Sequence, residues 1–158
     1  MARADDSFDW LHDYDPAEFG YAEFMAGIGS IVMGRSSYEA ARSLSGDWLY
    51  GEKRAYVLTG RPLADPPPRT ETRPADFAAL AAELRGQSDG DVWLYGGPKL
   101  WAGFLDAGAL DRFELYVVPV LIGEGIPLLP PQRRDRTLRL LESEPLSRGV
   151  AKLVYAVG

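Results

Sequence analysis

The sequence contains no cysteine and no asparagine, and its only histidine is His12. The lack of cysteine excludes disulfides, thiolate nucleophiles and zinc sites built on sulfur. One histidine cannot form a histidine cluster for a metal, so we expect no metal site. We favour a surface loop position for His12 over a general acid role. Without asparagine the chain has no acceptor for N-glycosylation.

Long apolar runs and an excess of positive charge are also lacking. No window approaches the roughly 18 consecutive apolar residues of a membrane span, and the N-terminus has no hydrophobic signal core. We therefore expect a cytoplasmic protein. The formal net charge of -6 argues against a nucleic acid or an anionic membrane as partner, because both reward a basic surface.

What remains is an ordinary globular composition. The 158 residues, 46% of them apolar, suit one domain with a substantial core. We find no internal repeat and no low-complexity tail. Residues 61–74 are rich in proline and charge, which predicts a surface connection.

Short apolar runs alternate with helical patterns along the first two thirds of the chain. Asp15 can cap a first helix with Pro16 at its first position, and Ser36 and Glu39 have the spacing of a capping box. The helices are predicted over residues 16–28, 36–44, 75–85 and 99–107. The strands are predicted over residues 30–33, 54–59, 91–95, 112–120, 137–142 and 151–157.

This order of elements predicts an α/β fold. The early strands alternate with helices and should be parallel, whereas the last two follow one another directly and should form a hairpin at one edge. We therefore expect three α/β/α layers around a mostly parallel sheet with a C-terminal antiparallel hairpin. Ligands of such sheets lie at the carboxyl ends of the strands, where Gly34, Thr59 and Gly96 fall.

The glycine pair Gly96 and Gly97 joins a predicted strand to a predicted helix that starts near Pro98. The first amide groups of a helix lack intrahelical partners, and the helix dipole makes that end partially positive. Glycine permits positive φ and lets an anion approach the main chain. The pair therefore indicates either a phosphate-binding site or simply a tight strand-to-helix turn.

Four segments carry a resemblance to a known family. They are residues 32–39 (VMGRSSYE), 55–61 (AYVLTGR), 92–97 (VWLYGG) and 118–128 (VPVLIGEGIPL). In order and spacing the chain resembles the dihydrofolate reductase-like superfamily, in particular the branch of the riboflavin-biosynthesis reductase domain. The resemblance implies an NADPH-dependent reductase that transfers a hydride to a small heterocyclic or ribosylated pyrimidine substrate, as in reduction of 5-amino-6-(5-phosphoribosylamino)uracil. It also implies a homodimer.

The resemblance implies a set of cofactor-binding residues. Arg35 would pair with the 2′-phosphate and Ser37 would face the pyrophosphate, unless they are a surface arginine and a structural cap. Lys99 is either an added positive charge or a solvated lysine. The full set is Gly34, Arg35, Ser36, Ser37, Thr59, Arg61, Gly96, Gly97, Pro98, Lys99 and Leu100.

The resemblance also points to residues for substrate and catalysis. A gap-free count aligns Glu18 with the catalytic carboxylate of dihydrofolate reductases, although an acidic residue in a first helical turn is also favoured by the dipole. Asp9 and Trp10 match a segment beside the substrate, unless Trp10 only packs. The loop of Gly123, Glu124 and Gly125 matches the substrate end of the family's cleft, where Glu124 is either a hydrogen-bond partner or a turn residue.

One family element has no counterpart in this sequence. Family members usually begin with an apolar strand that ends in a Ser-Leu-Asp-Gly-like turn, and this chain starts after it. We expect the loss of an interior strand to leave unpaired backbone groups on both neighbours. Three alternatives would compensate: the gap closes, a partner chain donates a strand or covers the edge, or the true start codon lies upstream. The alternative function is therefore a catalytically idle module that binds a nucleotide or mediates dimerisation.

Overall fold

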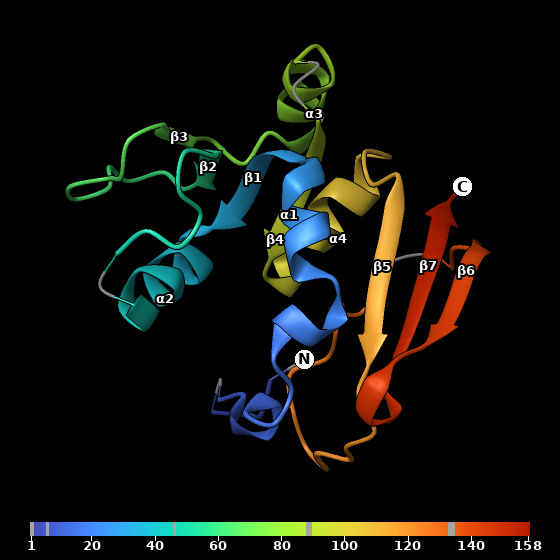
Figure 1. The fold of residues 1–158 in the computed structure, drawn as a ribbon. Coiled ribbons are helices and arrows are strands. Elements are labelled where there is room, and N and C mark those ends of the chain that lie inside the picture. The colour runs from blue at the N-terminus through green and yellow to red at the C-terminus, as the bar shows by residue number, and fades with distance from the viewer. Residues whose placement is uncertain (1, 6, 46, 88–89, 133–134) are drawn as a thin grey trace. The chain divides into compact units, whose positions relative to one another are not determined.

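The computed structural model describes residues 2–5, 7–45, 47–87, 90–132 and 135–158. The chain divides into two compact units, each described by itself below (Figure 1). Unit 1 comprises Met1–Phe24 and Leu110–Gly158, and unit 2 comprises Met25–Ala109. The expectation of a single domain stays a prediction.

A parallel sheet of four strands forms the centre of unit 2. Its order is β3-β2-β1-β4, and the strands are β1 (Ile28–Gly34), β2 (Arg54–Leu58), β3 (Thr70–Arg73) and β4 (Asp91–Gly96). Gly34 is in register with Leu58, and Met33 with Gly96, so three carboxyl ends lie side by side. The central strands are buried along consecutive residues, as expected for a parallel sheet covered on both faces.

Three helices cover this sheet: α2 (Arg35–Ser45), α3 (Phe77–Arg85) and α4 (Pro98–Asp106). Helix α2 packs against β1 and β2, whereas α4 packs against β4 and α3 (Figure 1). The Asp76 carboxylate caps α3 by accepting a 3.0 Å hydrogen bond from Ala79 N–H. Pro98 occupies the first turn of α4, as predicted. The predicted three-layer α/β class is confirmed.

Unit 1 contains a separate antiparallel sheet. Strand β7 (Ala151–Val157) lies between β5 (Arg112–Val117) and β6 (Leu138–Pro145) (Figure 1). The expected C-terminal hairpin is therefore present, but the prediction that it extends the edge of the parallel sheet is wrong. The physical reason is that the second strand of the hairpin pairs along its whole length with β5, which completes a sheet of its own.

Two further sequence predictions need correction. The first predicted helix is interrupted at Gly20, whose φ of 78° ends a short 3-10 helix (Pro16–Phe19) before α1 (Tyr21–Gly27) begins. The predicted connection of residues 61–74 contains β3, which pairs in parallel with β2. This edge strand has four polar residues and no alternation of apolar and polar residues, so the sequence pattern did not indicate a strand.

The two sheets have open edges. Among the described strands, β4 pairs only with β1, and β5 pairs only with β7. The expectation that one family strand is missing from the given sequence stays a prediction. Within the described ranges, every helix is too short or too polar to cross a membrane.

Candidate functional site

Four residues predicted to contact a cofactor meet where β1 and β4 end. A Cβ atom added at Gly34 would lie 3.8 Å from the carbonyl oxygen of Gly96, and one added at Gly97 would lie 3.9 Å from Oγ of Ser37. Gly96 has a φ of 128°, and a Cβ atom there would lie 3.0 Å from the ring of Trp101. Because glycine has no side chain, neighbouring groups come close to the main chain at these strand ends.

Helix α4 starts directly at this point. Gly97 is its N-cap residue, and no side chain caps the first turn. The Gly97 carbonyl accepts hydrogen bonds from the amides of Leu100 and Trp101 at 2.9 and 3.3 Å. The Trp101 indole donates a 2.7 Å hydrogen bond to the Leu94 carbonyl, which fixes the first turn of the helix against β4. The arrangement presents a helix N-terminus beside the exit of β1.

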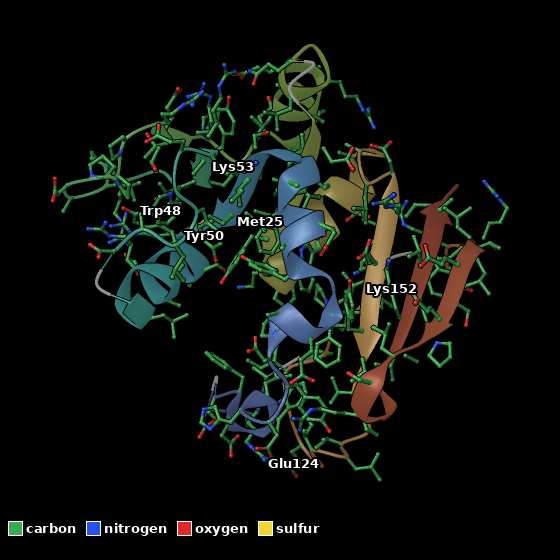
Figure 2. All side chains as sticks on the ribbon, viewed as in Figure 1. Met25, Trp48, Tyr50, Lys53, Glu124 and Lys152 are labelled. Carbon is green, nitrogen blue, oxygen red and sulfur yellow. The ribbon has the colours of Figure 1, made fainter. Side chains whose placement is uncertain are left out.

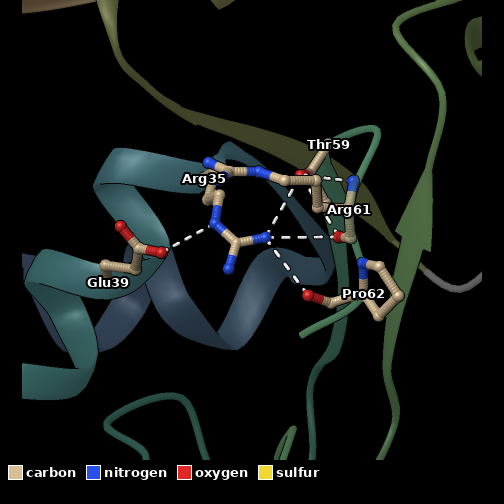
Figure 3. Close-up of polar contacts among 5 residues, drawn as sticks. All are labelled: Arg35, Glu39, Thr59, Arg61 and Pro62. Carbon is tan, nitrogen blue, oxygen red and sulfur yellow. Dashed lines mark hydrogen bonds and ion pairs between the residues drawn. The ribbon is translucent and has the colours of Figure 1, made fainter. Parts of the chain in front are cut away.

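Arg35 connects the exits of β1 and β2 (Figure 3). Its Nη1 donates to Thr59 Oγ1 at 3.4 Å and to the carbonyls of Arg61 and Pro62 at 3.2 Å each. Its Nε donates to Glu39 Oε1 at 2.7 Å, one turn along α2. The predicted capping box is wrong, because the helix already begins at Arg35 and the Glu39 carboxylate pairs with that guanidinium.

The other predicted cofactor residues differ in exposure. Ser36, Arg61 and Lys99 are exposed near the same strand ends, whereas the side chain of Leu100 is buried at 5% exposure. Leu100 therefore belongs to the core of unit 2, and only its backbone faces the first turn of α4. The cofactor roles of all these residues stay predictions.

A group of aromatic side chains lies beside these residues. Trp48 and Tyr50 lie next to α2 (Figure 2), and their ring centroids are 4.9 Å apart. The connected rings are those of Tyr38, Trp48, Tyr50, Trp93 and Tyr95. Tyr38 Oη and Trp48 Nε1 are buried without a hydrogen-bond partner among the described residues. The alternation of Trp93 and Tyr95 along β4 was the available sequence signal.

The residues predicted to bind substrate all belong to unit 1. Asp9 begins a 3-10 helix (Asp9–Leu11), and its carboxylate accepts a 2.6 Å hydrogen bond from Arg3, which lowers the pKa of Asp9. The predicted loop meets the N-terminal segment, because Ile126 N–H donates a 2.8 Å hydrogen bond to the Ala2 carbonyl. Glu124 is exposed on this loop (Figure 2). Unit 1 therefore brings both predicted substrate segments into the same compact body.

The predicted catalytic carboxylate already has a partner. Glu18 Oε2 accepts a 3.1 Å hydrogen bond from Nε of Arg148, which lies far away in the sequence. The Asp15 side chain caps the short helix that carries Glu18, as the sequence predicted, by accepting from Ala17 N–H at 2.9 Å. The structure thus gives Glu18 an ion pair in unit 1, and its catalytic role stays a prediction.

Comparisons with known proteins identify the family of the chain. The profile of the RibD C-terminal domain matches residues 53–152. YwjB of Bacillus subtilis is 30% identical over 151 residues, which cover 95% of this chain and 87% of YwjB. The riboflavin biosynthesis protein RibD of Corynebacterium ammoniagenes is 28% identical over 141 residues, which cover 81% of this chain and 42% of that protein.

Solved structures extend the comparison to the fold. A protein of Shewanella sp. PV-4 that is named for riboflavin biosynthesis superposes with a TM-score of 0.86 at 21% identity, covering 100% of this chain and 92% of that one. A second match is a protein of Thermotoga maritima named as a diaminohydroxyphosphoribosylaminopyrimidine deaminase and 5-amino-6-(5-phosphoribosylamino)uracil reductase. It superposes with a TM-score of 0.70 at 16% identity, and the match covers 99% of this chain and 52% of that one. With the profile match over most of its length, the chain belongs to the RibD C-terminal domain family, the family of a reductase domain.

Proposed function

We propose that the chain is an NADPH-dependent reductase acting on a small heterocyclic or ribosylated pyrimidine. The observation that carries the proposal is the meeting of the β1 and β4 exits, where Gly34, Gly96 and Gly97 leave the main chain bare beside Ser37. The Thermotoga maritima protein is named as a 5-amino-6-(5-phosphoribosylamino)uracil reductase, and this supports the proposed substrate class.

The residues present fit a dinucleotide. The α4 N-terminus and the Ser37 hydroxyl would hold the pyrophosphate, because unpaired helical amides and a hydroxyl donate to phosphate oxygens. Arg61 would supply positive charge toward the 2′-phosphate. Arg35, whose Nε and Nη1 already bond within the chain, would mainly hold the loop after β2 in place beside it. The bound cofactor would supply the hydride from its reduced nicotinamide ring. Glycine at positions 96 and 97 would keep side chains away from that approach.

The substrate side of the proposal rests on unit 1. Asp9, Trp10 and Glu124 would bind the substrate, since they combine carboxylates with an aromatic surface. Glu18 would deliver or relay the proton that accompanies hydride transfer, once its contact with Arg148 opens. These roles are proposals.

Thermal unfolding with each dinucleotide tests the cofactor. We expect NADPH to raise the melting temperature more than NADH does, because a ligand that binds only the folded chain stabilises it by mass action. The variant Gly97→Val should reduce the shift, since its branched side chain would extend toward Ser37. Gly27→Val, at the end of α1 and outside the predicted cofactor residues, is the matched control, because nothing lies within 4 Å of a Cβ atom there.

Absence of a shift with either dinucleotide would overturn the cofactor assignment. In a separate assay, turnover is measured as the loss of absorbance of the reduced nicotinamide in the presence of a ribosylated aminopyrimidine. A clear NADPH shift without turnover on any pyrimidine would support the idle binding module instead.

A further inference from the structure

A hollow lies at the opposite end of the parallel sheet from the proposed cofactor site. It has a volume of about 340 Å³ and opens where β1 and β2 begin. Six residues line it: Ile28, Gly29, Glu52, Lys53, Arg54 and Arg69. We call it the amino-end hollow. All of its residues belong to unit 2.

The lining of the amino-end hollow is basic although the chain as a whole is acidic. Three of the lining residues are cationic and only Glu52 is acidic, whereas the whole chain has a formal net charge of -6. The β2–β3 pairing creates this local excess, because it sets Thr70 opposite Ala55 and so brings Arg69 beside Arg54. A local excess of positive charge in an acidic protein selects anions at that place.

Two of the cations are held in position by hydrogen bonds within unit 2. Lys53 Nζ donates to the Ile28 carbonyl, which ties the ammonium group to the start of β1 (Figure 2). Arg54 Nη1 donates to Gln87 Oε1 at 3.3 Å, and Tyr56 Oη donates to the same oxygen at 3.0 Å. The Lys53 ammonium group has three donors, so it keeps donors for a ligand after its hydrogen bond to Ile28.

Arg69 is the third cation and the most available one. Its side chain is exposed and makes no hydrogen bond or ion pair within the part of the chain that the structure describes. Its backbone has a φ of 60°, which is uncommon for a residue with a side chain. The Arg69 carbonyl accepts a 3.0 Å hydrogen bond from Ala55 N–H, so β2 fixes the backbone while the guanidinium stays free.

We propose that the amino-end hollow binds a small phosphate dianion, either inorganic phosphate or the phosphate end of a small monoester. The net charge of the lining, three cations and one carboxylate, matches a phosphate near neutral pH. Guanidinium groups bind phosphate oxygens in pairs, which favours phosphate over a monovalent anion. The volume is at the lower end of the range for ligand sites, so it suits a small ligand and not a dinucleotide.

Isothermal titration at low ionic strength, with inorganic phosphate as the probe, tests this site. We expect one phosphate per chain, with saturating NADPH present or absent. Arg69→Gln should weaken the affinity about tenfold, the loss expected for one charge-assisted hydrogen bond, and Arg69→Lys should weaken it less. Arg42→Gln, on α2 outside the hollow, should leave the affinity unchanged.

Several results would overturn the proposal. They are no measurable binding to the original chain, equal losses in Arg69→Gln and Arg42→Gln, or complete displacement of phosphate by NADPH. Phosphate monoesters and inorganic phosphate are compared in the same titration to identify which source binds more tightly. The readout is independent of the proposed reductase activity, so failure of one proposal leaves the other standing.

Discussion

The Arg35 side chain links the carboxyl end of β1 to the loop that follows β2. Removing it in Arg35→Ala frees Thr59 Oγ1 and the carbonyls of Arg61 and Pro62 from their shared donor. We expect the free energy of unfolding to fall by about 1–2 kcal/mol, measured by denaturant titration. Arg42→Ala is the control on the same helix and should change it by less.

The same variant separates two roles of Arg35 in cofactor binding. If the guanidinium mainly holds the loop after β2, NADPH and NADH lose affinity by the same factor. We expect this result, because Nε and Nη1 are already engaged within the chain. A loss confined to NADPH would instead assign Arg35 to the 2′-phosphate, as the resemblance implies.

Tyr116 gives the chain a pH dependence at the alkaline end. Burial of the phenol is the main cause that raises the pKa of Tyr116 above its ordinary value, and the 2.8 Å hydrogen bond to Glu114 is the second cause. A phenol with a raised pKa in the folded state stabilises the fold below about pH 10, and this contribution is lost as the pH rises further.

Denaturant titrations above neutral pH check this contribution. We expect the free energy of unfolding of the original chain to decline more steeply above about pH 10 than that of Tyr116→Phe. Tyr155→Phe, on the same sheet, is the control. Identical slopes for Tyr116→Phe and the original chain would contradict the assignment.

At the scale of elements, α3 and α4 depend on one glycine. A Cβ atom at Gly103 would lie 2.3 Å from the ring of Phe77, which also packs edge-on against Phe104 with ring centroids 5.4 Å apart. Gly103→Ala should therefore lower the free energy of unfolding by about 1–3 kcal/mol through overpacking. Gly27→Ala has nothing within 4 Å of its new Cβ atom and is the matched control.

A second substitution tests the cause of this loss. Adding Phe77→Leu to Gly103→Ala removes the ring that the new methyl group meets. We expect the two changes together to destabilise by less than the sum of the single changes, because neighbouring sites couple. Simple additivity would show that the glycine is needed for another reason.

The elements that the sequence predicted well are those with one strong local signal. The strands β1, β2 and β4 are continuous apolar runs, and Asp15 and Pro98 have the expected positions at helix starts. Strand β3 was missed because Thr70–Arg73 is polar and becomes a strand only by pairing with β2. Sequence periodicity reports burial, and an edge strand with little burial leaves no such trace.

The candidate site was predictable to the extent that its parts are local. Glycine at strand exits can be found in a sequence, and Gly34, Gly96 and Gly97 do lie together. The contacts of Arg35 with the loop after β2, and of Arg69 with the amino-end hollow, arise from pairing between distant segments. No spacing in the sequence reports such contacts.

At the scale of the whole molecule, the homodimer expected from the resemblance has a candidate surface in unit 1. Cross-strand pairs align apolar residues on one face of the antiparallel sheet, among them Leu115 with Leu153 and Leu140 with Tyr155. Leu140 and Val117 are each 51% exposed. A second copy of this face would complement it through a twofold axis, since the same apolar patch occurs on both chains.

Light scattering after size exclusion tests this expectation. The original chain should have twice the mass of one chain, and Leu140→Glu should shift it toward the monomer, because a carboxylate would be buried at the contact. Leu44→Glu changes another exposed leucine, on α2, and should leave the dimer intact. A monomeric original chain would contradict the expectation.

The division of the chain has a consequence for biosynthesis. Unit 2 is a continuous stretch, whereas unit 1 needs both ends of the chain, as the contacts of Ala2 with Ile126 and of Glu18 with Arg148 require. On the ribosome, the middle of the nascent chain can therefore fold while the first residues still wait for the last strand to be translated. Stalled ribosome complexes should acquire protease resistance in the middle of the chain first, and in residues 1–24 only after β7 has left the ribosome.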